Sequence, residues 1–137
     1  MCRARINWLQ VQLEAGQGPM IVLAHHRTLD SVLKGMDKIK LSNGLAVAKM
    51  LAGSNRCQMV MNGHIHRIIF STFKGVAHSM IKSPCHQIPM ILGADASSLS
   101  VAELRGYGLL LLDADSPVLH HVNVDLSSGH IEFDTVS

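Results

Sequence analysis

Residues 57–67 read CQMVMNGHIHR, an apolar run that passes through one glycine into two histidines a single residue apart. A short continuous apolar run predicts a strand that is buried on both faces. Residues 20–26, MIVLAHH, repeat the arrangement, because a second apolar run ends directly in His25 and His26. A helix predicted over residues 45–52 joins the two runs, and strands joined through a helix are parallel. The two sets of histidines should therefore meet at one edge of the sheet, where open α/β sheets bind ligands.

The histidines after the second run have two readings. Gly63 lets the backbone bend and approach a neighbour closely, and His64 and His66 point to the same side if the chain stays extended. From the residues alone, His25, His64 and His66 are explained equally well as metal ligands or as hydrogen-bonded surface histidines. Convergence at a strand edge favours the ligand reading over what the tripeptide offers by itself.

The rest of the chain predicts a mixed fold. Ile6, Leu9 and Leu13 recur at helical spacing and predict a helix over residues 4–15. After His66 the pattern changes to short strands and turn residues, with strands predicted over residues 68–73, 75–81, 107–113, 118–124 and 130–133. Residues 87–103 fit no element, apart from a helical turn near residues 100–104. The fold class is α/β, with parallel strands at the front and antiparallel strands at the back, in a single domain of residues 1–137.

Composition excludes several classes of protein. The chain has 137 residues, of which 47% are apolar and 16% charged, so it forms a folded domain rather than a disordered segment. Its net charge is +2 with scattered basic residues, so we expect no nucleic-acid partner. No apolar run is long enough to span a membrane, and the first residues do not form a signal peptide. Three unpatterned cysteines predict reduced thiols and a cytoplasmic location.

Five stretches carry a family resemblance, in the order in which the family has them: INWLQVQL, IVLAHH, MVMNGHIHR, FSTFKGVAHSMIKSPCHQ and ELRGYGLLLLDAD. Together they cover nearly the whole chain. The chain resembles the C-terminal half of the calcineurin-like metallophosphoesterases, and most closely the bacterial class III 3′,5′-cyclic-nucleotide phosphodiesterases. The resemblance implies half of a four-layer α/β/β/α sandwich. It also implies a dinuclear site of Mn, Fe or Zn ions that hydrolyses a phosphodiester, such as a cyclic nucleotide, by a metal-bound hydroxide.

The resemblance assigns roles to four histidines. His25, His64 and His66 take the positions of metal ligands, and imidazole suits these metals. His26 takes a position beside the ligands or facing the substrate. The family commonly has prolines after its His-His pair, where this sequence has Arg27 and Thr28.

The family's remaining ligands lie in the motifs Asp-x-His, Gly-Asp-x-x-Asp and Gly-Asn-His-Asp/Glu, and none of them occurs in this sequence. The sequence therefore lacks the family's bridging carboxylate. Without it, two divalent cations repel each other, because neutral imidazoles do not offset their charge. We therefore expect a C-terminal fragment that is weak or inactive alone and holds at most one ion on three histidines. Asp30 is the nearest candidate for an extra ligand in the sequence. Exposed strand edges should favour a homo-oligomer or a companion chain. The alternative is a non-catalytic oligomerising or partner-binding module that retains the fold.

The other histidines have structural readings. His120 and His121 are adjacent on a predicted strand and point to opposite faces, and His78 and His130 receive the same structural reading. Cys85 and His86 are neighbours in sequence, which rarely aligns a nucleophile with its base, so they predict a loop near the site with at most a minor substrate contact.

Overall fold

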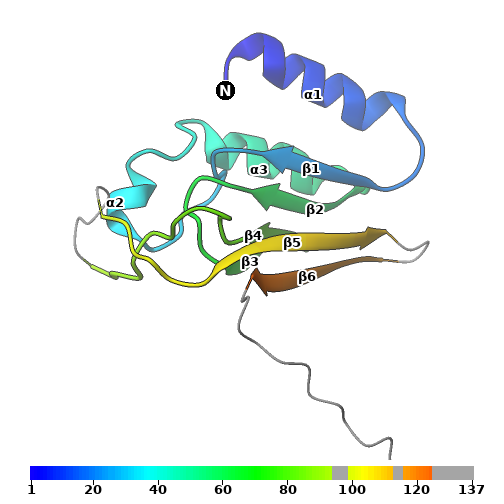
Figure 1. Cartoon of the computed structure of the whole chain (residues 1–137). Coiled ribbons are helices and arrows are strands. Elements are labelled where there is room, and N and C mark those ends of the chain that lie inside the picture. The colour runs from blue at the N-terminus through cyan, green and yellow to red at the C-terminus, as the bar shows by residue number, and fades with distance from the viewer. Residues whose placement is uncertain (94–98, 113–115, 125–137) are drawn as a thin grey trace, which may run out of the picture.

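The structure is a computed structural model that describes residues 1–93, 99–112 and 116–124 (Figure 1). The described part contains three helices and six strands. The helices are α1 (Arg3–Ala15), α2 (Lys34–Asp37) and α3 (Gly44–Gly53). The strands are β1 (Met20–Ala24), β2 (Cys57–Asn62), β3 (Ile69–Phe73), β4 (Val76–Met80), β5 (Arg105–Leu112) and β6 (Pro117–Val124).

Four strands form a mostly parallel sheet in the order β1-β2-β4-β3. β1 and β2 are parallel, with Ala24 beside Asn62 at their carboxyl ends. β4 continues parallel to β2, and β3 returns antiparallel beside β4. β5 and β6 form a separate antiparallel hairpin. The mixed α/β class and the parallel pairing of the two histidine-bearing strands are thus confirmed.

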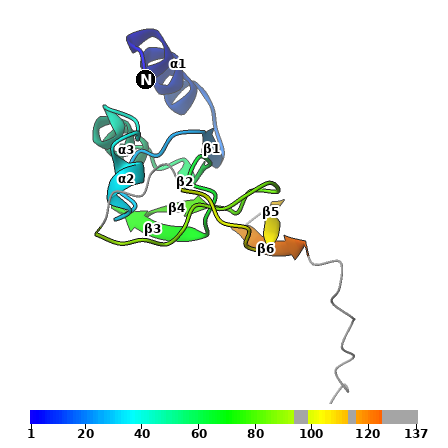
Figure 2. The same cartoon turned by 60° about the vertical axis from the view of Figure 1, so that its left-hand side comes forward.

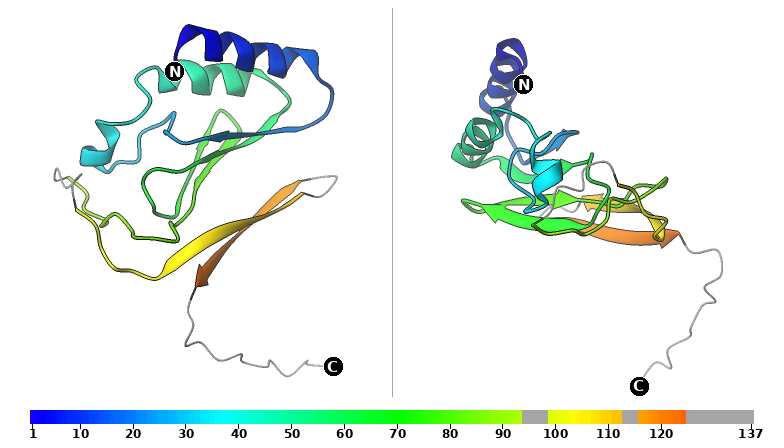
Figure 3. Two further views of the ribbon diagram at one scale, coloured as in Figure 1. Left: turned by 45° about the horizontal axis from the view of Figure 1, so that its top comes forward. Right: turned by 90° about the vertical axis from the view of Figure 1, so that its left-hand side faces the viewer.

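One face of the four-stranded sheet is covered by α1 and α3, which lie next to each other in Figures 1 and 3. Leu9 and Leu13 are the buried residues of α1, as their helical spacing predicts. They share an apolar cluster with the buried side chains of α3 and of the sheet, namely Val47, Leu51, Cys57, Val60 and Val76. This cluster fixes β1 and β2 side by side and so places the histidines that follow them.

The β5–β6 hairpin packs on the opposite face, near β3 and β4 (Figure 2). The Phe70 ring lies edge-on to the His121 ring with 5.1 Å between centroids, and Lys82 Nζ donates to Asn123 Oδ1 over 3.1 Å. The hairpin leaves the β1 end of this face open, because Leu23 remains 74% exposed. No helix of the described residues covers the outer side of the hairpin (Figure 1). The complete four-layer sandwich therefore stays a prediction.

Two segments have a secondary structure that differs from the sequence expectations. The prediction of a helical turn near residues 100–104 is wrong, because Val101 forms an isolated antiparallel bridge with Gln87. The connection after β1 contains the short helix α2, for which the sequence analysis predicts no element. The strand expected over residues 130–133 and His130 lie outside the described residues.

Candidate metal centre

The carboxyl ends of β1 and β2 bring His25 and Gly63 together. The Gly63 amide donates to the His25 carbonyl over 3.1 Å, which continues the parallel ladder one step past the strands. A Cβ on Gly63 would lie only 3.3 Å from His25 Nδ1, so glycine lets the two chains approach this closely. Asn62 Nδ2 donates to the Ala24 carbonyl over 3.0 Å and ties the same two strand ends from the side.

Three imidazole rings gather at this edge. The ring centroids of His25 and His64 are 5.1 Å apart, and those of His25 and His26 are 5.0 Å apart. His26 is the nearest neighbour of His64, with 4.5 Å between centroids. The sequence reading placed His26 beside the ligands, and the structure brings its ring into the same group as His25 and His64.

His66 lies beside His86 rather than in that group of rings. Their ring centroids are 4.7 Å apart, and His66 Nδ1 is 3.0 Å from the His86 carbonyl oxygen. Because a carbonyl only accepts, Nδ1 carries the hydrogen and donates it. This contact leaves Nε2 of His66 as the nitrogen with a free lone pair, the arrangement that second partners of metal-binding histidines commonly impose.

The condition under which His64 and His66 would point to the same side, an extended chain, is not met. His64 has φ +75° and His66 has φ +54°, so both residues are left-handed. Ile65 between them is only 1% exposed and lies in an apolar cluster with Leu33, Met36, Met80 and Ile88. In this turn Ile65 is buried, the His64 ring lies beside those of His25 and His26, and the His66 ring lies beside that of His86.

The surroundings of His64 and His66 lower the pKa of both side chains and so favour their neutral forms. Burial lowers the pKa of His64, and the nearby charges of His26, His25 and His66 lower it further. Burial also lowers the pKa of His66. The hydrogen bond to the His86 carbonyl raises this pKa, but burial has the larger effect. A metal binds the neutral imidazole, so both pKa shifts favour ligation.

The fit to a metal ion is partial. His64 Nε2 is buried without a hydrogen-bond partner, and coordination of a metal ion would satisfy this nitrogen. However, the described residues contain no ready-made cluster of three or more His, Cys, Asp or Glu side chains that could hold a metal. Asp30, the candidate extra ligand, has its carboxylate against the Lys40 ammonium. The residues fit as the imidazole part of a site to which further ligands must be added.

An apolar groove of about 300 Å³ adjoins His25 on the open face of the sheet. Leu23, Met61 and Ile81 supply its apolar walls, and Asn62 and Gly63 lie at its histidine end. The groove therefore lies on the part of the sheet face that the hairpin leaves uncovered.

Three other described histidines, His78, His120 and His121, lie outside this group of rings. His120 is exposed, whereas His121 is half-buried against Phe70, so their side chains lie on opposite faces as predicted. His78 is buried, with Nδ1 3.3 Å from Thr28 Oγ1. The loop predicted near the site at Cys85 and His86 is present, because the His86 carbonyl and ring contact His66. The hydrogen bond itself could not be predicted from the sequence.

No family model matches the chain. It is a distant homologue of a protein described as a probable cyclic nucleotide phosphodiesterase from Rhodopseudomonas palustris, with 27% identity over 122 residues. The match covers 88% of this chain and 44% of that protein, so the chain spans less than half of its relative's length. None of the described helices is long and apolar enough to cross a membrane.

Proposed function

We propose that this chain carries the histidine part of a metal-dependent phosphoesterase that acts on a cyclic nucleotide or a related phosphodiester. Two findings support the proposal: the relationship to a probable cyclic nucleotide phosphodiesterase, and the gathering of His25, His26 and His64 where β1 and β2 end. The second finding is the one that carries it, because three imidazoles converge at the carboxyl ends of parallel strands, the edge where open α/β sheets bind ligands.

His25, His64 and His66 are the proposed ligands for Mn, Fe or Zn, and His26 is proposed to stand beside them. When bound, a divalent metal polarises a phosphoryl oxygen as a Lewis acid. Burial lowers the pKa of His64 and His66, the His86 carbonyl fixes the His66 tautomer, and Gly63 allows the close approach of His25. Carboxylate ligands must come from outside the described residues, from more polypeptide, a second copy or a companion chain. We therefore expect the chain alone to be weak or inactive.

Metal content tests the proposal most directly. The purified chain should bind a transition metal in stoichiometric amount, and His66→Ala should lose it. Hydrolysis of bis(4-nitrophenyl) phosphate with Mn²⁺ should be weak or absent. Robust turnover that disappears in His64→Ala would overturn the expectation of low activity, and a chain that binds no metal would overturn the function itself.

A second candidate is a non-catalytic module that associates through its uncovered sheet. Leu23 on the edge strand β1 is 74% exposed, and a further groove of about 260 Å³ runs between β1 and α1, beside the exposed Trp8. Within the described residues β1 pairs only with β2, so its other edge is free to take a strand. A second copy or a companion chain fits this edge, and the same partner is compatible with the enzyme.

A further inference from the structure

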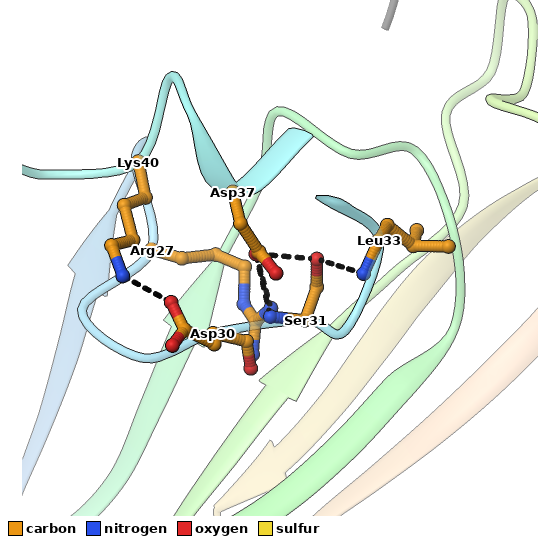
Figure 4. Close-up of polar contacts among 6 residues, drawn as sticks. All are labelled: Arg27, Asp30, Ser31, Leu33, Asp37 and Lys40. Atoms are coloured by element: carbon orange, nitrogen blue, oxygen red, sulfur yellow. Dashed lines mark hydrogen bonds and ion pairs between the residues drawn. The ribbon is translucent and has the colours of Figure 1, made fainter. Parts of the chain in front are cut away.

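A buried arginine organises the segment that follows the β1 histidines (Figure 4). Arg27 is only 3% exposed, and its Nη2 donates to the Asp30 carbonyl over 2.7 Å. Its Nη1 lies 3.8 Å from Asp37 Oδ1, and that same oxygen accepts hydrogen bonds from the amide and the hydroxyl of Ser31, each at 2.7 Å. The guanidinium therefore closes residues 27–37 into a loop with α2 at its end.

The closed loop presents two apolar side chains to the interior. Leu33 immediately precedes α2 and is 4% exposed, and Met36 lies within α2 and is 5% exposed. Both belong to the apolar cluster that contains Ile65, the residue between His64 and His66. The loop that Arg27 closes is thus in one packed unit with the turn that carries two of the proposed ligands.

We propose that Arg27 and Asp37 are positioning residues for the histidine site: they hold α2 against Ile65 and so keep His64 and His66 in their left-handed conformations. A left-handed conformation is unfavourable for a residue other than glycine and persists only when its surroundings enforce it. The surroundings act through Ile65, the buried residue between the two histidines. Leu33 and Met36 pack against Ile65, and the contacts of Arg27 hold these two residues in place. This inference rests on the proposed function only where it concerns metal affinity.

The guanidinium engages the two acidic residues in different ways: Nη2 donates a hydrogen bond to the Asp30 carbonyl, whereas Nη1 lies 3.8 Å from Asp37 Oδ1, an ion-pair separation, and makes no hydrogen bond. Burial lowers the pKa of Arg27, while the charges of Asp37 and Asp30 raise it again. The pair therefore stabilises an otherwise costly buried cation, and loss of one member leaves the other uncompensated.

Arg56 provides a matched control. Its guanidinium also ties backbone segments together, donating to the carbonyls of Gly18, Gln12 and Leu13 over 2.8, 2.8 and 3.0 Å. These contacts join the end of α1 to the approach to β1, at the opposite end of the strands from the histidines (Figure 1). Arg56→Met should lower the stability of the fold without reaching the His64–His66 turn.

The test uses the isotopically labelled whole chain in the absence of metal. Backbone coupling constants report φ at His64 and His66, and the imidazole nitrogen spectrum reports the His66 tautomer. We expect Arg27→Met and Asp37→Asn to move both couplings toward values for negative φ and to remove the fixed Nδ1–H of His66. Asp37→Asn retains an oxygen for the two Ser31 donors, so it is the variant that keeps the fold if Arg27→Met does not.

Titration with Co²⁺ completes the test. If the proposed metal site exists, both variants should weaken Co²⁺ binding at least about tenfold, the loss typical of residues that orient metal ligands. Unchanged couplings in a folded Asp37→Asn chain, or equal changes in Arg56→Met, would overturn the positioning role. A wild-type chain that binds no Co²⁺ while its couplings still respond to Asp37→Asn would overturn the proposed function and leave the positioning role standing.

Discussion

At the scale of single residues, the left-handed conformation of His64 allows the effect of a mutation on metal binding to be separated from its effect on stability. His64 has φ +75°, a region that asparagine tolerates better than alanine. We predict that His64→Ala and His64→Asn both remove metal binding, but that alanine lowers the free energy of unfolding by about 1 kcal/mol more. Urea unfolding of both metal-free variants measures the difference. Equal stability would mean that the left-handed turn is not retained in solution.

The identities of the site residues could be predicted from sequence more fully than their arrangement. Two apolar runs ending in histidines suffice to place His25 and His64 at neighbouring strand ends, and their rings indeed lie 5.1 Å apart. The direction of His66 could not be predicted in this way. It depends on the burial of Ile65 among residues far away in sequence, whereas the alternation rule assumes an extended chain.

At the scale of elements, the turn between β2 and β3 depends on its packing. Ile65→Ala removes a side chain that is 1% exposed, so the free energy of unfolding should fall by about 2–5 kcal/mol. We also predict that the variant loses metal affinity, because the turn is no longer pinned. Leu51→Ala is the control, since Leu51 is fully buried in the other apolar cluster, between the helices and the sheet. Calorimetry with and without metal should show similar losses of stability but a loss of affinity only for Ile65→Ala.

The helix α2 could not be predicted from the sequence because it is too short. It has four residues, with a glycine among them and no side-chain cap at its start. Periodicity needs a longer window than this to indicate a helix. Its position is set instead by Arg27, Ser31 and Asp37, whose contacts are apparent only in three dimensions.

At the scale of the whole molecule, we predict that the free energy of unfolding depends on pH through His121, which lies between the hairpin and the sheet. Both ring nitrogens of His121 are buried without partners, and burial lowers its pKa from the ordinary 6.5. The unfolded chain then takes up a proton at a higher pH than the folded chain does. The free energy of unfolding should therefore fall as the pH drops through 6.5 toward the lower folded-state value.

His121→Leu isolates this contribution from those of His64, His66 and His78, whose pKa values are lowered in the same direction. The variant should have a shallower dependence of stability on pH between about pH 7 and pH 5, measured by urea unfolding at each pH. His120→Leu changes the exposed neighbour on the other face and should leave the slope of the wild type. A His121→Leu chain with the wild-type slope would contradict the prediction.

Association through β1 is also a property of the whole molecule. Leu23→Lys places a charge on the open sheet beside the free edge, which should shift any dimer toward monomer in sedimentation velocity. Leu112→Lys is the control, because Leu112 is 73% exposed, as much as Leu23, but lies at the far end of the hairpin strand. If both variants shift the equilibrium equally, association is governed by general surface hydrophobicity and not by β1.

The division into a parallel sheet and an antiparallel hairpin was predictable, because strand order follows from short connections and turn residues. The packing of the hairpin on the sheet was not. It depends on contacts such as Phe70 with His121 and Lys82 with Asn123, which join segments about 40–50 residues apart.

The exposed outer side of the hairpin affects the abundance of this polypeptide in a cell. Tyr107, Leu109 and Leu111 alternate along β5, and each keeps 48% of its surface exposed. Chaperones and proteases sort newly made proteins by apolar strands of this kind. The abundance of the polypeptide should therefore be set by how soon that surface is covered after synthesis, rather than by the stability of its core.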